Sequence, residues 1–255
     1  MVTTSRKGAS RVADVPADVL RELNAGRIEA ATLAENLATD FAALLTQVLP
    51  ELSDDAAKLD SKAGITKRMA GVAALIHKRH GAGKLDFLTS HPSDLVRGWG
   101  AYLLASLPEL TLESRIAQMR PFAVDHHFGV REWSWLALRP YIVAAPEESI
   151  EILRPWTGET SEYLRRFAVE AIRPRGVWSA HIPELKSDPS LALSLLEPVR
   201  SDPSRYVQDS VANWLNDAWK SQPNWVEQLC EDWLKQSSSE ATSYIAKRAL
   251  RNQKR

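Results

Sequence analysis

Residues 163–178 read Tyr-Leu-Arg-Arg-Phe-Ala-Val-Glu-Ala-Ile-Arg-Pro-Arg-Gly-Val-Trp. Apolar residues recur here at the i, i+3, i+4, i+7 and i+8 spacing of a helix that packs on one side. They are Leu164, Phe167, Ala168, Ala171 and Ile172. Arg166, Glu170 and Arg173 fall on the opposite face, and Pro174 ends the predicted helix. The stretch therefore predicts an amphipathic helix followed by a loop that carries Trp178.

The polar face of this helix has an unusual charge pattern. One carboxylate, Glu170, lies among four arginines, which are Arg165, Arg166, Arg173 and Arg175. One interpretation is a site that holds a cation beside an anionic polymer. The other is a solvent-exposed face with ordinary salt bridges, which contribute little. The stretch by itself leaves both interpretations open.

A weak internal repeat extends this pattern along the chain. The aligned pairs are Val96-Arg97, Val130-Arg131, Leu164-Arg165, Val207-Gln208 and Ile245-Ala246, at steps of 34, 34, 43 and 38 residues. Each step covers two predicted helices and a loop, and such a pair cannot bury its apolar face without a neighbour. Strand-like alternation is absent. We therefore predict an all-α fold, a HEAT-like repeat α-solenoid (ARM-type superhelix) whose second helices line one groove.

The periodicity also predicts how the chain is divided. Residues 1–12 are basic and rich in small side chains, which predicts a disordered tail, and residues 13–255 are expected to form a single repeat domain. One long helix is expected over residues 28–49 and another over residues 127–144. Trp133 and Trp214 fall in apolar stripes and are expected in the core.

Composition excludes several classes of site. The 255 residues include 32 basic and 32 acidic side chains, so a nucleic-acid binder would need its cations gathered on one face. Cys230 is the single cysteine, and the adjacent His126 and His127 would point about 100° apart on a helix, so no metal site or cofactor is expected. No apolar run reaches the roughly 18 residues of a membrane span, and no signal peptide opens the chain. A cytoplasmic monomer is expected.

Four motifs in order carry a resemblance to a known family. They are Leu23-Asn24-Ala25-Gly26 with the helical segment 28–41; Val130-Arg131-Glu132-Trp133 with 137–140; Leu164-Arg165-Arg166 with Glu170, 173–175 and Trp178; and 210–213 with 215–217. A weaker match is Ala249-Leu250-Arg251. From about residue 15 onward the chain resembles the HEAT-repeat DNA alkylation repair glycosylases, and among them the AlkC-like branch.

The resemblance implies excision of cationic alkylated bases from duplex DNA, with 3-methyladenine and 3-methylcytosine as the expected lesions. Their positive charge weakens the glycosidic bond, so a carboxylate near C1′ can stabilise an oxocarbenium-like sugar and position water. The resemblance makes Glu132, Glu170 and Asp217 candidate catalytic carboxylates and Trp178 the candidate ring against the sugar. The candidate DNA-binding residues are Arg165, Arg166, Arg173, Arg175, Asn213 and Asn216.

The chain also departs from the family pattern. Ala171 replaces a glycine, Gly176-Val177 replaces Leu-Pro, and Gln208-Asp209 replaces two arginines of the proposed groove. The chain ends where some relatives continue into an immunoglobulin-like domain. The neutral balance and Gln208-Asp209 favour an alternative, a HEAT-repeat protein that binds DNA or a protein partner without cutting. The complete set of acids with Trp178 favours the enzyme.

Overall fold

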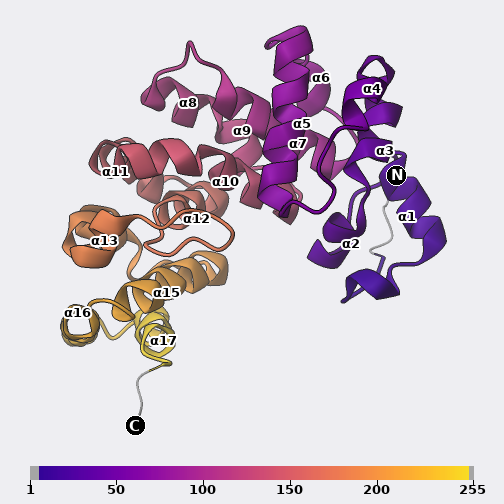
Figure 1. The fold of residues 1–255 in the computed structure, drawn as a ribbon. Helices are drawn as coiled ribbons and strands as arrows, with labels where there is room; N and C mark the ends of the chain where they lie inside the picture. The colour runs from indigo at the N-terminus through magenta and orange to yellow at the C-terminus, as the bar shows by residue number, and fades with distance from the viewer. Residues whose placement is uncertain (1–5, 253–255) are drawn as a thin grey trace. The chain divides into compact units, whose positions relative to one another are not determined.

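The structure, a computed structural model, describes residues 6–252, and its regular secondary structure is helical (Figure 1). It contains 17 α-helices and five short 3₁₀-helices, and the described residues include no strand. The predicted all-α class is therefore confirmed. None of these helices combines the length and apolarity that a membrane span requires.

The described part of the chain forms two compact units. The first comprises the described part of Met1–Glu109 together with Asp125–Ala137, and the second comprises Leu110–Val124 with the described part of Leu138–Arg255. Helix α10 (Phe128–Ala144) begins in the first unit and ends in the second. The single domain expected over residues 13–255 stays a prediction.

The other helices of the first unit follow in chain order. They are η1 (Val12–Asp14), α1 (Ala17–Asn24), α2 (Leu33–Ala38), α3 (Phe41–Val48), η2 (Pro50–Leu52), α4 (Ser53–Ala56), α5 (Ile65–His80), α6 (Leu85–Thr89) and α7 (Asp94–Ser106). Helix α7 is almost wholly buried and packs on α5 and α6. It includes the fully enclosed Trp99.

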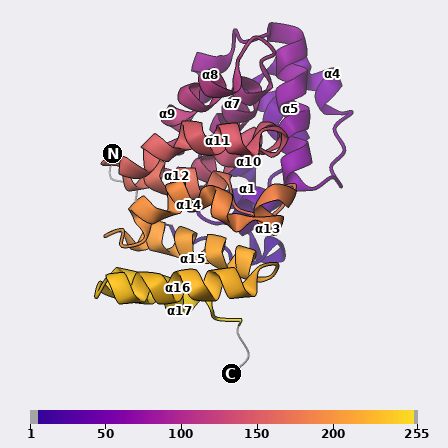
Figure 2. The same ribbon diagram turned by 90° about the vertical axis from the view of Figure 1, so that its left-hand side faces the viewer.

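The helices of the second unit, besides the end of α10, also follow in order. They are α8 (Leu112–Gln118), α9 (Arg120–Ala123), α11 (Pro146–Leu153), η3 (Arg154–Gly158), α12 (Glu162–Ala171), α13 (Pro183–Ser187), η4 (Pro189–Ala192), α14 (Leu193–Leu196), η5 (Glu197–Val199), α15 (Arg205–Trp219), α16 (Pro223–Gln236) and α17 (Glu240–Ala249). Helix α15 packs between α12 and α17, so three successive second helices lie side by side (Figure 1). The first helix α16 lies in front of α17 in the view of Figure 2. Trp214 of α15 is fully buried, as expected, and so is Trp133 in the first unit.

Two boundaries near the N-terminus differ from expectation. The helix expected over residues 28–49 is two helices, because the Asp40 carboxylate accepts hydrogen bonds from the Ala42 and Ala43 amides and starts α3 as a new helix. The expected tail is held by contacts from residue 6 onward, where Arg6 pairs with the buried Glu35 at 2.5 Å. Residues 1–5 of that tail lie outside the described residues.

The repeat alignment corresponds to a recurring contact. Arg97, Arg131 and Arg165 each use Nη1 to donate to the carbonyls five and six residues earlier, in the turn before the second helix. Gln208 keeps half of this arrangement, because its Nε2 donates to the Asp202 carbonyl at 2.7 Å. Position 208 therefore braces the turn of its repeat, as Arg97, Arg131 and Arg165 do in theirs.

Candidate active site and nucleic-acid interface

An ion cluster joins α12 to α15 in the second unit. Glu170 Oε1 accepts from the Ser210 hydroxyl at 2.7 Å and lies 3.6 Å from Arg166 Nη2. Its Oε2 accepts from Arg173 Nη1 at 3.2 Å. Glu170 is only 3% exposed, so the carboxylate that the sequence places opposite the apolar stripe is covered by the neighbouring helix. The interpretation of this position as an exposed salt-bridged face is therefore wrong.

Arg173 connects this acid to a second one. Its Nε and Nη2 donate to Asp217 Oδ2 at 2.9 and 2.6 Å, and Lys220 Nζ donates to Asp217 Oδ1 at 3.0 Å. Asp217 is 4% exposed. Two of the three candidate carboxylates, Glu170 and Asp217, thus share the guanidinium of Arg173.

The cluster keeps Glu170 ionised. Burial by itself would raise the pKa of Glu170, but the charges of Arg166 and Arg173 and the hydrogen bond from Ser210 outweigh it, so the pKa lies below its ordinary value. Burial by itself would lower the pKa of Arg173, but the carboxylates of Glu170 and Asp217 outweigh it. The pKa of Arg173 therefore lies above its ordinary value. At neutral pH the site is therefore an array of fixed charges, the kind of environment that stabilises developing charge without reorganisation.

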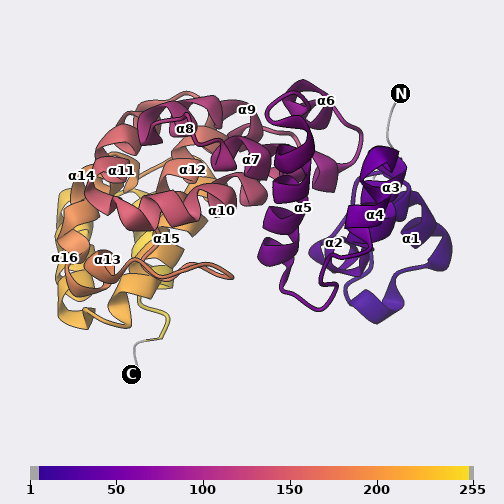
Figure 3. The same cartoon turned by 45° about the horizontal axis from the view of Figure 1, so that its top comes forward.

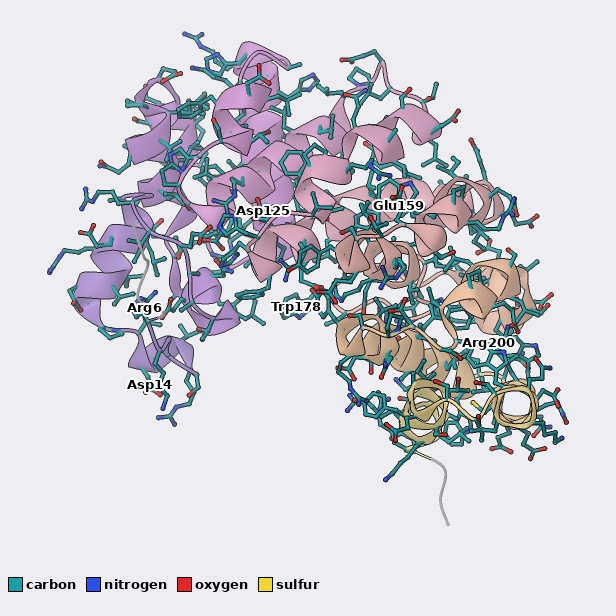
Figure 4. The ribbon with its side chains drawn as sticks, turned by 180° about the vertical axis from the view of Figure 1, so that it is seen from behind. Arg6, Asp14, Asp125, Glu159, Trp178 and Arg200 are labelled. Carbon is teal, nitrogen blue, oxygen red and sulfur yellow. The ribbon has the colours of Figure 1, made fainter. Side chains whose placement is uncertain are left out.

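Figure 3 shows the loop between α12 and α13. Arg173 of the ion cluster lies at the start of this loop. The Ile182 amide donates to the Pro174 carbonyl at 3.1 Å and closes the loop at its base. Arg175 turns back onto the end of α15, where its Nε donates to the Asp217 carbonyl at 3.3 Å. Its Nη2 donates to Ser221 Oγ, just after the helix, at 2.6 Å. Trp178 lies at the tip, half exposed, with a φ of 58° (Figure 4). This left-handed backbone is uncommon for a bulky residue and costs on the order of 1 kcal/mol.

Arg139 holds the loop from beneath and was not predicted as a site residue. Its guanidinium is 1% exposed and donates to three backbone carbonyls, those of Ala171 and Ala180 at 2.8 Å and of Arg173 at 2.6 Å. Burial lowers the pKa of Arg139 to about 10. The signal that could have revealed it is the repeat, because Arg139 stands nine residues after Val130 as Arg173 does after Leu164.

The loop sequence also fits this anchor. A Cβ on Gly176 would lie 1.9 Å from Ser179 Oγ and 3.4 Å from Arg139 Cζ. A larger side chain at position 176 would therefore require the Ser179 side chain to move.

Three other candidate DNA-binding residues mainly contact the protein itself. Arg165 donates from Nε and Nη2 to the two oxygens of Asp202 at 2.6 and 2.9 Å, in addition to its turn contacts. Asn216 is 1% exposed and donates to the Ala249 carbonyl at the end of α17. Asn213 accepts from Arg251 at 3.1 Å and is half buried. Arg165 and Asn216 are thus placed as residues that hold the repeat together.

The remaining candidate acid, Glu132, belongs to the first unit. Its Oε2 accepts from Trp135 Nε1 at 3.1 Å within α10, and its side chain is half buried. It is the least buried of the three candidate carboxylates. The structure therefore joins Glu170 and Asp217 in one cluster of the second unit, whereas Glu132 belongs to the first unit.

The part of the chain that carries this site matches a known protein family. The sequence signature of the DNA alkylation repair enzyme family matches residues 124–252, about half of the chain. The chain belongs to this family. The match includes all of the helices that carry the cluster, the Trp178 loop and Glu132.

One protein of Bacillus subtilis is similar in sequence to part of the chain. The uncharacterized protein YhaZ of Bacillus subtilis (strain 168) is 40% identical over 118 residues, which are 46% of this chain and 32% of YhaZ. The chain thus matches about a third of that relative's length.

Solved structures share the fold at lower identity. The alkylpurine DNA glycosylase AlkC of Pseudomonas fluorescens, bound to DNA containing an abasic site analog, has a TM-score of 0.65 at 24% identity, over 96% of this chain and 65% of that one. AlkD2 from Streptococcus mutans gives 0.63 at 21% identity, over 81% and 97%. These likenesses show the HEAT-like helical-repeat fold.

Proposed function

We propose that this family member is a DNA glycosylase that removes cationic alkylated bases, 3-methyladenine and also 3-methylcytosine, from duplex DNA. The observation that carries the proposal is the Glu170–Arg173–Asp217 cluster at the base of the Trp178 loop, within the part of the chain that matches the family. Fixed carboxylates favour an oxocarbenium-like sugar, and an indole ring attracts a cationic base.

The proposed roles follow from exposure and charge. Trp178 is the ring that contacts the sugar, because its side chain is half exposed at the tip of an anchored loop. Arg166, Arg173 and Arg175 supply positive charge toward the DNA. Glu170 and Asp217 keep Arg173 in place and contribute negative charge from beneath, while the less buried Glu132 is the acid with the readiest access to water.

The test is release of methylated bases from alkylated duplex DNA by the purified protein under single-turnover conditions. Glu132→Gln, Glu170→Gln and Asp217→Asn each remove a charge and keep the shape of the side chain. Losing one preorganised electrostatic group typically costs about 10²–10³ in rate, so we expect at least one variant to fall in that range while its DNA affinity is kept. Rates near wild type in all three variants would leave the non-catalytic DNA binder as the better assignment.

A further inference from the structure

Three tyrosines occupy equivalent positions in successive repeats of the second unit. Tyr163, Tyr206 and Tyr244 each stand one residue before the aligned apolar position, on α12, α15 and α17. All three are half buried, and the rings of Tyr163 and Tyr206 meet edge to face at 6.0 Å between centroids. An aromatic row therefore runs across the three second helices.

Arginines stack on this row. Arg166 Cζ lies 4.2 Å from the centroid of the Tyr206 ring, and Arg205 Cζ lies 3.5 Å from that of Tyr244. A guanidinium held by its flat face keeps its N–H donors in plane and pointing outward. Phosphate oxygens match this planar set of donors. Tyr206 and Tyr244 thus each serve as a platform that fixes the direction in which an arginine can donate.

Arg205 is the most accessible of these arginines. Its side chain is exposed, whereas that of Arg166 is 13% exposed and belongs to the Glu170 cluster. Within residues 6–252 no carboxylate forms an ion pair with Arg205. The ring beneath it is fixed, because the Tyr244 hydroxyl donates to Asp209 Oδ1 at 2.6 Å and Arg248 pairs with the same oxygen at 3.3 Å.

The position of Arg205 gives no benefit to its own helix. It is the first residue of α15, where a positive charge is unfavourable because the helix dipole places partial positive charge at that end. An exposed cation that is stacked, unpaired with acid and unfavourable for the helix is better explained by an anionic ligand than by the fold.

We propose that Arg205, stacked on Tyr244, binds a backbone phosphate of duplex DNA that flanks the lesion. The proposal rests on the proposed function, since the matched family supplies DNA as the partner. Arg205 and Asp217 are 12 residues apart on α15, about 18 Å at 1.5 Å per residue, which equals roughly five nucleotide steps. The contact therefore lies outside the acid cluster and adds to affinity without touching the reacting sugar.

The experiment measures the affinity of the full chain for a 25-base-pair duplex across a salt series, with and without an abasic-site analog. Arg205→Ala should reduce the log–log salt slope by about 0.9, the value for one phosphate contact. Tyr244→Leu should weaken binding in the same direction by freeing the guanidinium, and Tyr244→Phe, which keeps the ring, should weaken it less. The matched control is Arg154→Ala, an exposed arginine paired with Glu151 on the first-helix side of its repeat.

The outcomes separate this inference from the proposed function. One outcome is that wild-type protein releases methylated bases while Arg205→Ala has the same salt slope of DNA binding as the Arg154→Ala control. The proposed phosphate contact is then wrong, and the proposed glycosylase function is supported. If wild-type protein releases none but Arg205→Ala lowers the slope, the contact stands and the enzymatic assignment fails. Single-turnover excision at saturating Arg205→Ala should match wild type, and a slower chemical step would overturn the assignment of Arg205 to flanking DNA.

Discussion

Arg173 and Asp217, which are 44 residues apart in the sequence, share two hydrogen bonds of 2.9 and 2.6 Å between the guanidinium and Oδ2. Arg173 follows the last turn of α12, and Asp217 lies near the end of α15. The pair therefore fixes the start of the Trp178 loop relative to the neighbouring repeat. Because both side chains are largely buried, their contribution is not weakened by water as that of a surface pair would be.

We expect Arg173→Ala to lower the free energy of unfolding by about 3–5 kcal/mol, because it leaves two buried carboxylates without their shared cation. Asp217→Asn should cost less, since Glu170 still accepts from Arg173. The effects should be non-additive in the double variant by about 1–3 kcal/mol, measured by urea unfolding. Lys220→Ala, whose side chain is 43% exposed, is the control and should change stability little. Additive losses would show that the pair is not coupled.

The variant Arg165→Ala can show whether Arg165 stabilises the fold or contacts DNA. Its side chain is bidentate to Asp202 and braces the turn before α12, so Arg165→Ala should lower stability by about 3 kcal/mol or more. The salt slope of DNA binding should stay as in wild type, because no phosphate contact is lost. A reduced slope with unchanged stability would return Arg165 to the DNA-binding set.

Helical periodicity predicted the fold class because each second helix has a continuous apolar stripe, as in α12 and α15. The repeat alignment was equally informative, and its physical basis is the arginine or glutamine that braces each turn at Arg97, Arg131, Arg165 and Gln208. The break at Asp40 was missed, although an aspartate before an apolar run is a readable N-cap signal.

The site was less predictable than the fold. A helical wheel places Glu170 opposite the apolar stripe, but it cannot show that Ser210 and Arg173 close over that face. Arg139 was overlooked because its partners are backbone carbonyls, which a sequence does not distinguish. Side chains that bond to distant backbone, such as Arg139 and Asn216, are where prediction from the sequence failed.

The lowered pKa of Glu170 predicts a pH dependence of stability. A carboxyl whose pKa is lower in the folded protein stabilises it above the unfolded pKa, and this contribution is lost as pH falls through the folded value. Wild type should therefore be more stable than Glu170→Gln at pH 7, and the difference should shrink below the ordinary glutamate pKa of about 4.3. Urea unfolding of both proteins between pH 7 and 3 measures this. A difference that stays constant with pH would contradict the assignment.

The last prediction concerns Arg139 and the loop that it holds. Arg139→Met keeps much of the apolar volume but leaves the carbonyls of Ala171, Arg173 and Ala180 without their donor. We expect a stability loss of about 3 kcal/mol and a looser loop, because hydrogen bonds from a charged group are worth about 1.5–3 kcal/mol each and the buried carbonyls become unsatisfied. Trypsin should then cleave after Arg175 faster than in wild type.

The Arg139→Met substitution should also affect activity, because Trp178 lies at the tip of the loop that Arg139 holds. If Arg139 acts by positioning Trp178, Arg139→Met and Trp178→Ala should both slow base excision, by about fivefold to thirtyfold for the loss of 1–2 kcal/mol of cation–π stabilisation. Cleavage after Arg175 should be faster in Arg139→Met, because this variant loses the three hydrogen bonds that hold the backbone at the base of the loop. Arg154→Met, at an exposed pair, should change neither. Faster cleavage with normal excision would mean that a fixed loop is not needed for the chemistry, and Arg139 would then serve stability alone.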